Sequence, residues 1–131
     1  MLKLVNTVGA VLTTDQEIPL NVKFNTNNKI SFINNKIIMN KGGFYKIDGN
    51  FELLNTGTSA TTVSVQLFAD ETPITEAIAT KSLAASGQDN FIINDLERIL
   101  PQFNVEKVKL TFRVSGGVSL VNANVGIFEI K

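Results

Sequence analysis

A regular alternation of apolar and polar side chains is the feature that most limits what this chain can fold into. Between positions 105 and 114 the apolar face carries Val108, Leu110, Phe112 and Val114, and the polar face carries Lys107, Lys109, Thr111 and Arg113. A period of two is typical of a β-strand, because successive side chains of a strand point to opposite faces. This segment therefore predicts a strand with one buried face.

The same pattern recurs along the chain. Positions 44–54, 61–68 and 121–128 alternate in the same way, and shorter apolar runs at 3–8, 18–24, 30–33, 36–39 and 90–93 predict further strands. Val, Ile, Thr and Phe, which are common in strands, make up 46 of the 131 residues. Segment 73–85 fits a helix or a strand, and we favour a strand. Many short strands between turns indicate a two-sheet antiparallel β-sandwich or a barrel.

Turn residues separate these runs. Asn34-Asn35 and Gly116-Gly117 each stand between two apolar segments and predict tight hairpin turns. One short helical turn is expected near residues 95–100, with Asn94 or Asp95 as its cap and Pro101 ending it.

Composition narrows the chemistry that the chain can perform. It contains no Cys and no His, so thiol nucleophiles, thiolate metal sites and His-dependent catalysis cannot be built. Carboxylate, Lys and Tyr chemistry remain, but no motif indicates a reaction. We therefore expect no catalytic residue, no cofactor-binding residue and no metal ligand, and we expect that the protein is not an enzyme.

Charge argues against a nucleic-acid partner. Twelve basic residues balance twelve acidic ones, whereas nucleic-acid binders usually carry a basic excess. No segment approaches the roughly 20 apolar residues of a membrane span, and the first residues do not resemble a signal peptide. Charged residues are 18% of the chain, below the roughly 25% of ordinary soluble domains. Burial of part of the surface in an oligomer would explain so low a charge.

Several segments in order resemble the tumour necrosis factor (TNF)/complement globular-head superfamily of jelly rolls. They are KGGFYKI at 41–47, VSVQL at 63–67, DETPI at 70–74, Ser86-Gly87, VKLTF at 108–112 and ANVGIF at 123–128. The resemblance runs from about position 18 to the end and looks closest to small versions encoded by phages of Gram-positive bacteria. It departs at 96–105, where a longer insert replaces a tight Gly-Asp turn.

The resemblance implies an all-β fold of about ten strands, arranged as a jelly-roll sandwich that assembles as a homotrimer. We expect a single domain over 1–131, with an N-terminal strand or arm at 1–17 and the sandwich core at 18–131. The arm is a candidate anchor to a particle or a neighbouring subunit. The candidate subunit-interface residues are Tyr45, Phe68, Phe112 and Phe128.

The function that follows is a non-enzymatic structural module of a phage or prophage particle, such as a head fibre, a decoration protein or a tail-fibre tip. Its partners would be copies of itself and other virion proteins, and it would be found in the virion, or in the bacterial cytoplasm before assembly. The main alternative is a carbohydrate- or receptor-binding module that uses loop residues such as 55–62. A secreted TNF-like factor and an enzyme built on carboxylates are further alternatives.

Single residues also leave two interpretations open. Tyr45 is either an interface residue or a core aromatic whose hydroxyl finds a partner. Phe44, Phe68 and Phe128 fall on the polar-facing side, which indicates either an interface or a strand register shifted by one residue.

Charged residues leave similar alternatives. Asp70-Glu71 with Asp48 or Glu52 could hold calcium, although a solvated surface is favoured. Glu52 and Glu76 would suit glycoside hydrolysis only if the fold brought them together. The basic face at 107, 109 and 113 is either a site for an anionic surface or the ordinary wet face of a sheet.

Overall fold

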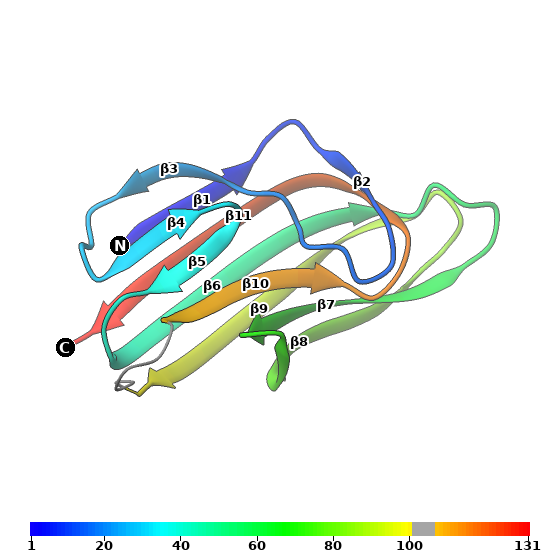
Figure 1. Cartoon of the computed structure of the whole chain (residues 1–131). Helices are drawn as coiled ribbons and strands as arrows, with labels where there is room; N and C mark the ends of the chain where they lie inside the picture. Colours follow the sequence, from blue (N-terminus) through cyan, green and yellow to red (C-terminus); the bar gives the residue numbers. More distant parts are fainter. Residues whose placement is uncertain (101–106) are drawn as a thin grey trace.

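The alternating segments pair into two antiparallel sheets that pack face to face (Figure 1). The computed structural model describes residues 1–100 and 107–131. The strands are β1 (Leu2–Asn6), β2 (Ala10–Leu12), β3 (Asn21–Asn25), β4 (Ile30–Ile33), β5 (Lys36–Met39), β6 (Gly43–Leu54), β7 (Thr61–Ala69), β8 (Thr72–Leu83), β9 (Gln88–Ile99), β10 (Val108–Val114) and β11 (Val118–Ile130).

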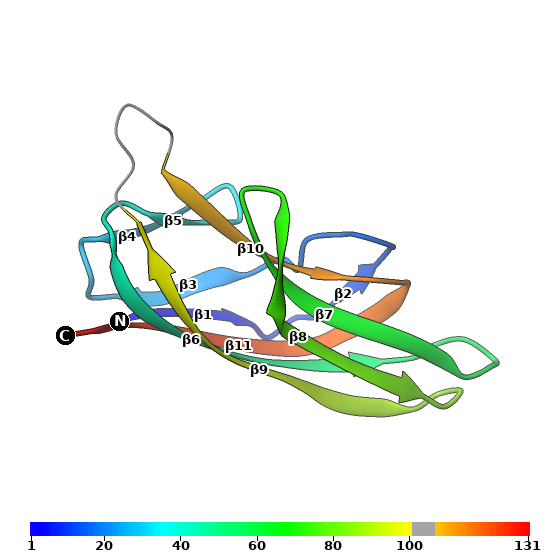
Figure 2. The ribbon, with the colours of Figure 1, turned by 90° about the horizontal axis from the view of Figure 1, so that it is seen from below.

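The strand order is that of a jelly roll, which confirms the predicted fold class. Sheet A has the order β3-β1-β11-β6-β9, with β2 also paired to β11, and sheet B has the order β4-β5-β10-β7-β8. Figure 2 shows the two sheets edge-on, with β8 and β9 at one side of the sandwich. Consecutive strands change sheet repeatedly, so both sheets contain strands from distant parts of the chain.

The core lies between the two sheets and consists of the alternating apolar residues. Phe51 of sheet A and Phe112 of sheet B meet at its centre, with ring centroids 4.9 Å apart. Gly49 makes this contact possible, because a Cβ at that position would lie 2.7 Å from the Phe51 ring. The face predicted for 108–114 is confirmed: Leu110, Phe112 and Val114 are buried.

The prediction of a helical turn at 95–100 is wrong, because residues 95–99 form the end of a strand. Residues 95–99 belong to β9, which pairs with β6 in an unbroken register from Gln88 to Ile99. Alternate residues of β9 face the core, among them Phe91, Ile93 and Ile99. The local helix signals are outweighed because the strand gains a ladder of backbone hydrogen bonds along its whole length. Positions 101–106, which include Pro101 and residues 101–105 of the predicted insert, lie outside the described residues.

The two predicted hairpin turns differ in outcome. Asn34 and Asn35 have φ of 51° and 61° and join β4 to β5 in a tight hairpin, as predicted. Gly116-Gly117 does not form a hairpin, because β10 lies in sheet B and β11 in sheet A. The two glycines instead carry the chain from one sheet to the other. The preference for a strand over 73–85 is confirmed by β8.

The N-terminal segment is part of the sandwich. β1 is hydrogen-bonded to β3 on one side and β11 on the other, and Leu2 and Leu4 are buried. Both edges of β1 are therefore already paired within the chain. In the described residues, no helix has the length and apolar character needed to cross a bilayer.

Candidate functional site

The outward face of sheet A carries a group of exposed apolar side chains. We call Phe44, Ile92, Leu96, Phe128 and Ile130 the sheet A patch. Leu96 is 60% exposed and Ile92 is 56% exposed, although both stand in the middle of a long paired strand. Exposed apolar residues that gather on one face commonly mark an interaction surface.

The strand register brings Phe44, Leu96, Phe128 and Ile130 together, and Ile92 lies two rows away, opposite Asn50. Phe128 faces Lys46, which in turn faces Leu96 on the next strand. One row further, Ile130 faces Phe44, which is opposite Arg98. Opposed residues of antiparallel neighbours share a face, so these rows form one continuous surface across β11, β6 and β9.

Local contacts position the two aromatic rings of the patch. The Arg98 guanidinium carbon lies 5.9 Å from the centre of the Phe44 ring. A Cβ at Gly126 would lie 3.0 Å from the Phe128 ring, so the ring lies close over this glycine. The small residue at 126 therefore allows Phe128 to lie close to the sheet.

The patch continues into a shallow polar depression of about 320 Å³. Its lining includes Lys3, Asn50, Asn94 and Asn124 as well as Ile92 and Phe128. Asn50, Asn94 and Asn124 present their amides at this depression. The face thus combines apolar side chains with amides that can donate and accept hydrogen bonds.

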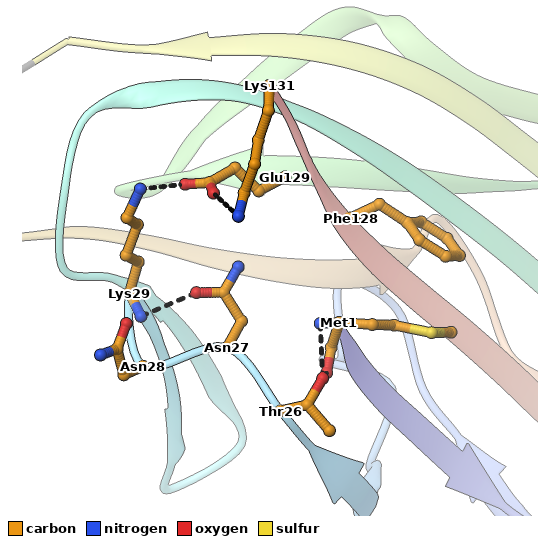
Figure 3. A pocket seen from close by; sticks show the side chains of 8 residues that line it. All are labelled: Met1, Thr26, Asn27, Asn28, Lys29, Phe128, Glu129 and Lys131. Carbon is orange, nitrogen blue, oxygen red and sulfur yellow. Dashed lines mark hydrogen bonds and ion pairs between the residues drawn. The ribbon is translucent and has the colours of Figure 1, made fainter.

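A second depression, of about 530 Å³, lies at the end of the sandwich where the two termini meet (Figure 3). Lys29 Nζ lies 2.5 Å from Glu129 Oε2, and the hydrogen bond from Lys29 lowers the pKa of the Glu129 carboxyl. The N-terminal amine of Met1 donates to Thr26 Oγ1 at 2.9 Å. With Asn27, Asn28 and Phe128 also in the lining, this pocket offers mainly polar groups beside one aromatic ring.

The four predicted interface residues lie in different environments. Tyr45 is fully buried and its hydroxyl donates to the carbonyl oxygen of Lys41 at 3.0 Å, which is the core interpretation left open by the sequence. Phe112 is also in the core, so neither ring offers area to a neighbouring subunit. Phe128 belongs to the sheet A patch. Phe68 lies in sheet B, with the Arg113 guanidinium carbon 4.5 Å from its ring centre. A role of Phe68 and Phe128 in an interface stays a prediction.

The charged residues considered from the sequence either form ion pairs with one another or lie in different sheets. Arg113 Nη2 donates to Glu71 Oε2 at 2.6 Å, so the basic face of β10 is partly neutralised. The hydrogen bond from Arg113 lowers the pKa of the Glu71 carboxyl. Asp48 lies in sheet A, whereas Glu71 stands at the β7–β8 turn of sheet B. The structure therefore does not assemble the calcium site considered from the sequence.

The predicted binding loop at 55–62 contains a structural anchor. The Asn55 side chain is buried; it donates to the carbonyl oxygens of Ser59 and Ala84 and accepts from the Gly57 N–H. These bonds fix the loop base, and the exposed residues 56–60 form its tip. Sequence reasoning missed Ile92 and Leu96 of the patch, because segment 88–99 does not alternate regularly: Asp95 holds an inward position, whereas Ile92 and Leu96 face outward.

The fold of the whole chain is similar to that of solved TNF-type proteins. Eiger TNF from S. frugiperda matches with a TM-score of 0.79 at 10% identity, over 99% of this chain and 91% of that one. Murine APRIL gives 0.65 at 6% identity, over 94% and 97%, and rabbit GITRL gives 0.57 at 14% identity, over 100% and 95%. No protein-family model and no curated protein matches the sequence. The chain therefore has a TNF-like jelly-roll fold.

Proposed function

We propose that this protein is a non-enzymatic module that assembles as a homotrimer through the sheet A patch. The observation that carries the proposal is the cluster of exposed apolar side chains on β6, β9 and β11, where most other outward-facing side chains are polar. Burial of apolar area drives protein association, and aromatic residues are enriched at interfaces. The number of three subunits comes from the resemblance to the TNF/complement superfamily, and the patch supplies the face.

We propose further that the trimer is a structural protein of a phage or prophage particle, such as a head fibre, a decoration protein or a tail-fibre tip. Support comes from the sequence resemblance carried by segments such as KGGFYKI at 41–47 and ANVGIF at 123–128. A TNF-like fold in a chain of 131 residues is compatible with a small particle component. Other virion proteins would be its further partners.

Absolute mass in solution tests the assembly. Light scattering coupled to size-exclusion chromatography, over a wide range of protein concentration, should give the mass of three chains. Ile92→Lys places a charge on the exposed face of β9 within the sheet A patch and should yield monomers that keep the circular dichroism of the folded protein. A monomer at every concentration of the unchanged protein would contradict the proposal.

The chain offers a matched control for this substitution. Ile33 is 56% exposed, like Ile92, but lies in sheet B at the end of β4. Ile33→Lys makes the same chemical change away from the patch and should leave the mass unchanged. If both variants dissociate equally, the patch is not the interface.

The pocket between the termini favours a second candidate function, the binding of a surface carbohydrate. Asn27, Asn28 and Lys29 present amide and ammonium groups, and Phe128 presents a ring on which a sugar could stack. A glycan array with the purified protein tests this candidate. Binding that is reduced by Asn28→Ala would support it, and no binding to any glycan would leave the assembly proposal as the better account.

A further inference from the structure

The edges of the two sheets meet along one side of the sandwich without forming a shared ladder. β8 is the last strand of sheet B and β9 the last strand of sheet A, and a turn at 84–87 joins them. We call the line between these two strands the β8–β9 seam. Because no ladder of backbone hydrogen bonds spans the seam, side chains from the two strands must stabilise it.

Close to the turn, a basic residue bridges the seam. Lys81 Nζ of β8 lies 3.2 Å from Asp89 Oδ1 of β9. The same ammonium lies 5.9 Å from the centre of the Phe91 ring. Here the carboxylate of one strand is matched by a cation from the other.

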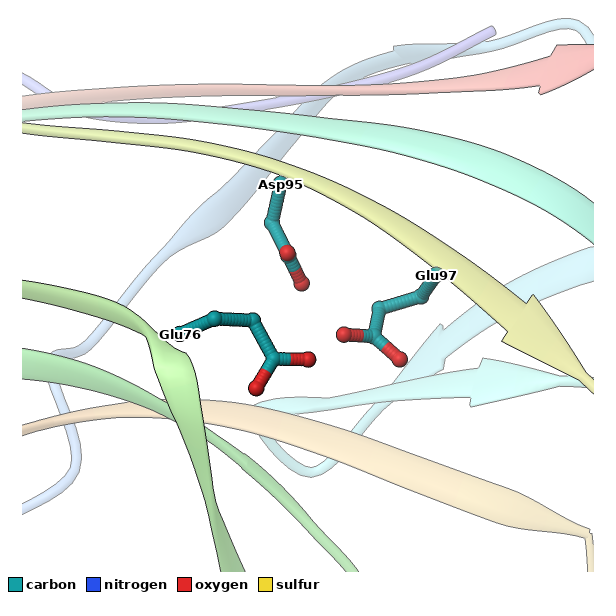
Figure 4. A group of neighbouring side chains, drawn as sticks. All are labelled: Glu76, Asp95 and Glu97. Atoms are coloured by element: carbon teal, nitrogen blue, oxygen red, sulfur yellow. The ribbon is translucent and has the colours of Figure 1, made fainter.

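Further from the turn, three carboxylates meet across the seam (Figure 4). Glu76 comes from β8, and Asp95 and Glu97 come from β9; each has a carboxylate oxygen within 4.8 Å of the others. Among residues 1–100 and 107–131, no Lys or Arg forms an ion pair with any of them. We call these three residues the seam carboxylates.

A bulge in β8 directs Glu76 toward β9. In the β7–β8 pairing, Gln66 is opposite Ile78 and Phe68 is opposite Pro73, so residues 74–77 of β8 stand opposite Leu67 alone. Gln66 Nε2 donates to the freed carbonyl oxygen of Ile74 at 3.1 Å and stabilises the bulge. Bulges of this kind redirect side chains and are common beside functional sites.

The seam carboxylates include buried oxygens that have no hydrogen-bond partner in the described structure. Asp95 is only 8% exposed, and its Oδ2 has no hydrogen-bond partner. Glu97 Oε1 is likewise buried and has no hydrogen-bond partner. Burying a carboxylate oxygen without a donor or a cation is costly, so the arrangement favours a positively charged ligand.

We propose that Glu76, Asp95 and Glu97 bind one calcium ion across the β8–β9 seam. Calcium takes oxygen ligands at about 2.3–2.6 Å in flexible geometry, so two of its ligands lie up to roughly 5 Å apart. The 4.8 Å spread of the carboxylate oxygens fits this limit. Magnesium demands shorter, near-octahedral coordination, and softer metals prefer the His and Cys that this chain lacks. Glu76 is exposed, which leaves room for water ligands on the ion.

Terbium luminescence can report binding at this site, because the Tyr ring that would excite the ion lies on the neighbouring strand. Terbium replaces calcium in oxygen sites and is excited through a nearby Tyr or Trp ring. This chain has one Tyr and no Trp, and Tyr45 stands opposite Glu97 in the β6–β9 pairing. Titration with terbium chloride should give luminescence that saturates at one ion per chain and that calcium chloride displaces. Calcium chloride should also raise the melting temperature of the unchanged protein, and a chelator should reverse the rise.

Amide substitutions keep the shape of the ligands and remove their charge. Asp95→Asn and Glu97→Gln should each weaken terbium and calcium binding by at least about tenfold. They also relieve crowding of like charges, so both variants should fold without metal. Tyr45→Phe should remove the luminescence and keep the calcium-dependent rise in melting temperature. Asp15→Asn, an exposed acid at a turn, is the control for loss of one charge and should change neither readout.

Three outcomes would overturn the proposal. The first is no change in the melting temperature of the unchanged protein on addition of calcium chloride. The second is terbium binding that survives in Asp95→Asn or is weakened equally by Asp15→Asn, since both results indicate general attraction to the acidic surface. The third, a rise with magnesium chloride as large as that with calcium chloride, would refute calcium as the ligand.

Discussion

Asn34 and Asn35 adopt the same left-handed conformation at one turn, but only Asn35 makes long-range contacts. Its Nδ2 donates to the Ile18 carbonyl oxygen at 3.0 Å, and its Oδ1 accepts from the Leu20 N–H at 2.9 Å. The side chain thereby fixes the segment that leads into β3. Asn34 is exposed and forms no side-chain hydrogen bond with the described residues.

Glycine substitutions separate these two roles. Both positions have positive φ, which Gly adopts without strain. Asn34→Gly should change the free energy of unfolding by less than about 0.5 kcal/mol. Asn35→Gly should lower it by about 1–3 kcal/mol, because two hydrogen bonds are lost. Urea denaturation of both variants checks the prediction, and equal effects would show that the Asn35 side chain contributes nothing.

Gly49 tests how closely the core is packed. A Cβ here would approach the Phe51 ring at 2.7 Å and the Phe112 ring at 3.5 Å. Gly49→Ala should therefore lower the free energy of unfolding by about 1–3 kcal/mol, because the buried ring pair must shift. Gly126→Ala is the control, since the Phe128 ring above it lies at the surface and can move. Thermal melts that rank Gly126→Ala as the more damaging change would contradict this account.

At the scale of strands, the Arg113 side chain connects β10 both to β7 and to the turn that follows β7. Arg113 of β10 binds Glu71 at the turn and lies over Phe68 of β7. The pKa of Glu71 is lowered by the hydrogen bond from Arg113 and then by its charge. The ionised form is thus favoured in the folded protein, so the pair stabilises the fold at pH above the ordinary Glu value of 4.5. This contribution is lost as the pH falls through the lowered pKa of the folded state.

The difference in unfolding free energy between the unchanged protein and Glu71→Gln should follow that dependence. It should be largest at neutral pH and shrink as the pH falls below about 4.5, because protonation of Glu71 removes the ion pair from the unchanged protein, whereas Glu71→Gln lacks it at every pH. Added salt should also reduce it, because Glu71 is exposed to solvent. Urea titrations over a pH series give the measurement, with Asp15→Asn as the control. A difference that grows on acidification would refute the assigned sign.

Sequence patterns predicted the strands well where the alternation is regular, as in β6, β7 and β10, and the jelly-roll fold is confirmed. They failed where a local signal competes with distant pairing. The cap-like Asp95 predicted a helical turn, but pairing with β6 makes this segment a strand, and so Leu96 was missed as a surface residue. Gly116-Gly117 correctly predicts a turn, but these residues do not indicate whether the next strand joins the same sheet or the other one.

The seam carboxylates were beyond prediction for a related reason. Glu76 and Asp95 come from different sheets, and a bulge that no residue type announces turns Glu76 toward β9. Phe128 of the sheet A patch was predicted, because it breaks the apolar/polar alternation of its own strand.

The whole molecule combines a well-packed core with low net charge and a cluster of exposed apolar side chains on the outer face of sheet A. Twelve positive and twelve negative charges cancel, so little electrostatic repulsion opposes association of copies. Association that buries the sheet A patch would stabilise the folded state by mass action, because only the folded chain presents this face. The melting temperature of the protein would then depend on its concentration.

Calorimetry over about a hundredfold range of concentration tests this coupling. The unchanged protein should melt at higher temperature as concentration rises. Ile92→Lys should melt at one temperature throughout, close to the dilute limit of the unchanged protein, because its side chain is half-exposed and its loss costs the single chain little. Ile33→Lys, with equal exposure on the other sheet, should keep the dependence. A concentration-independent melting temperature for the unchanged protein, at a mass of one chain, would mean that the sheet A patch does not drive assembly in solution.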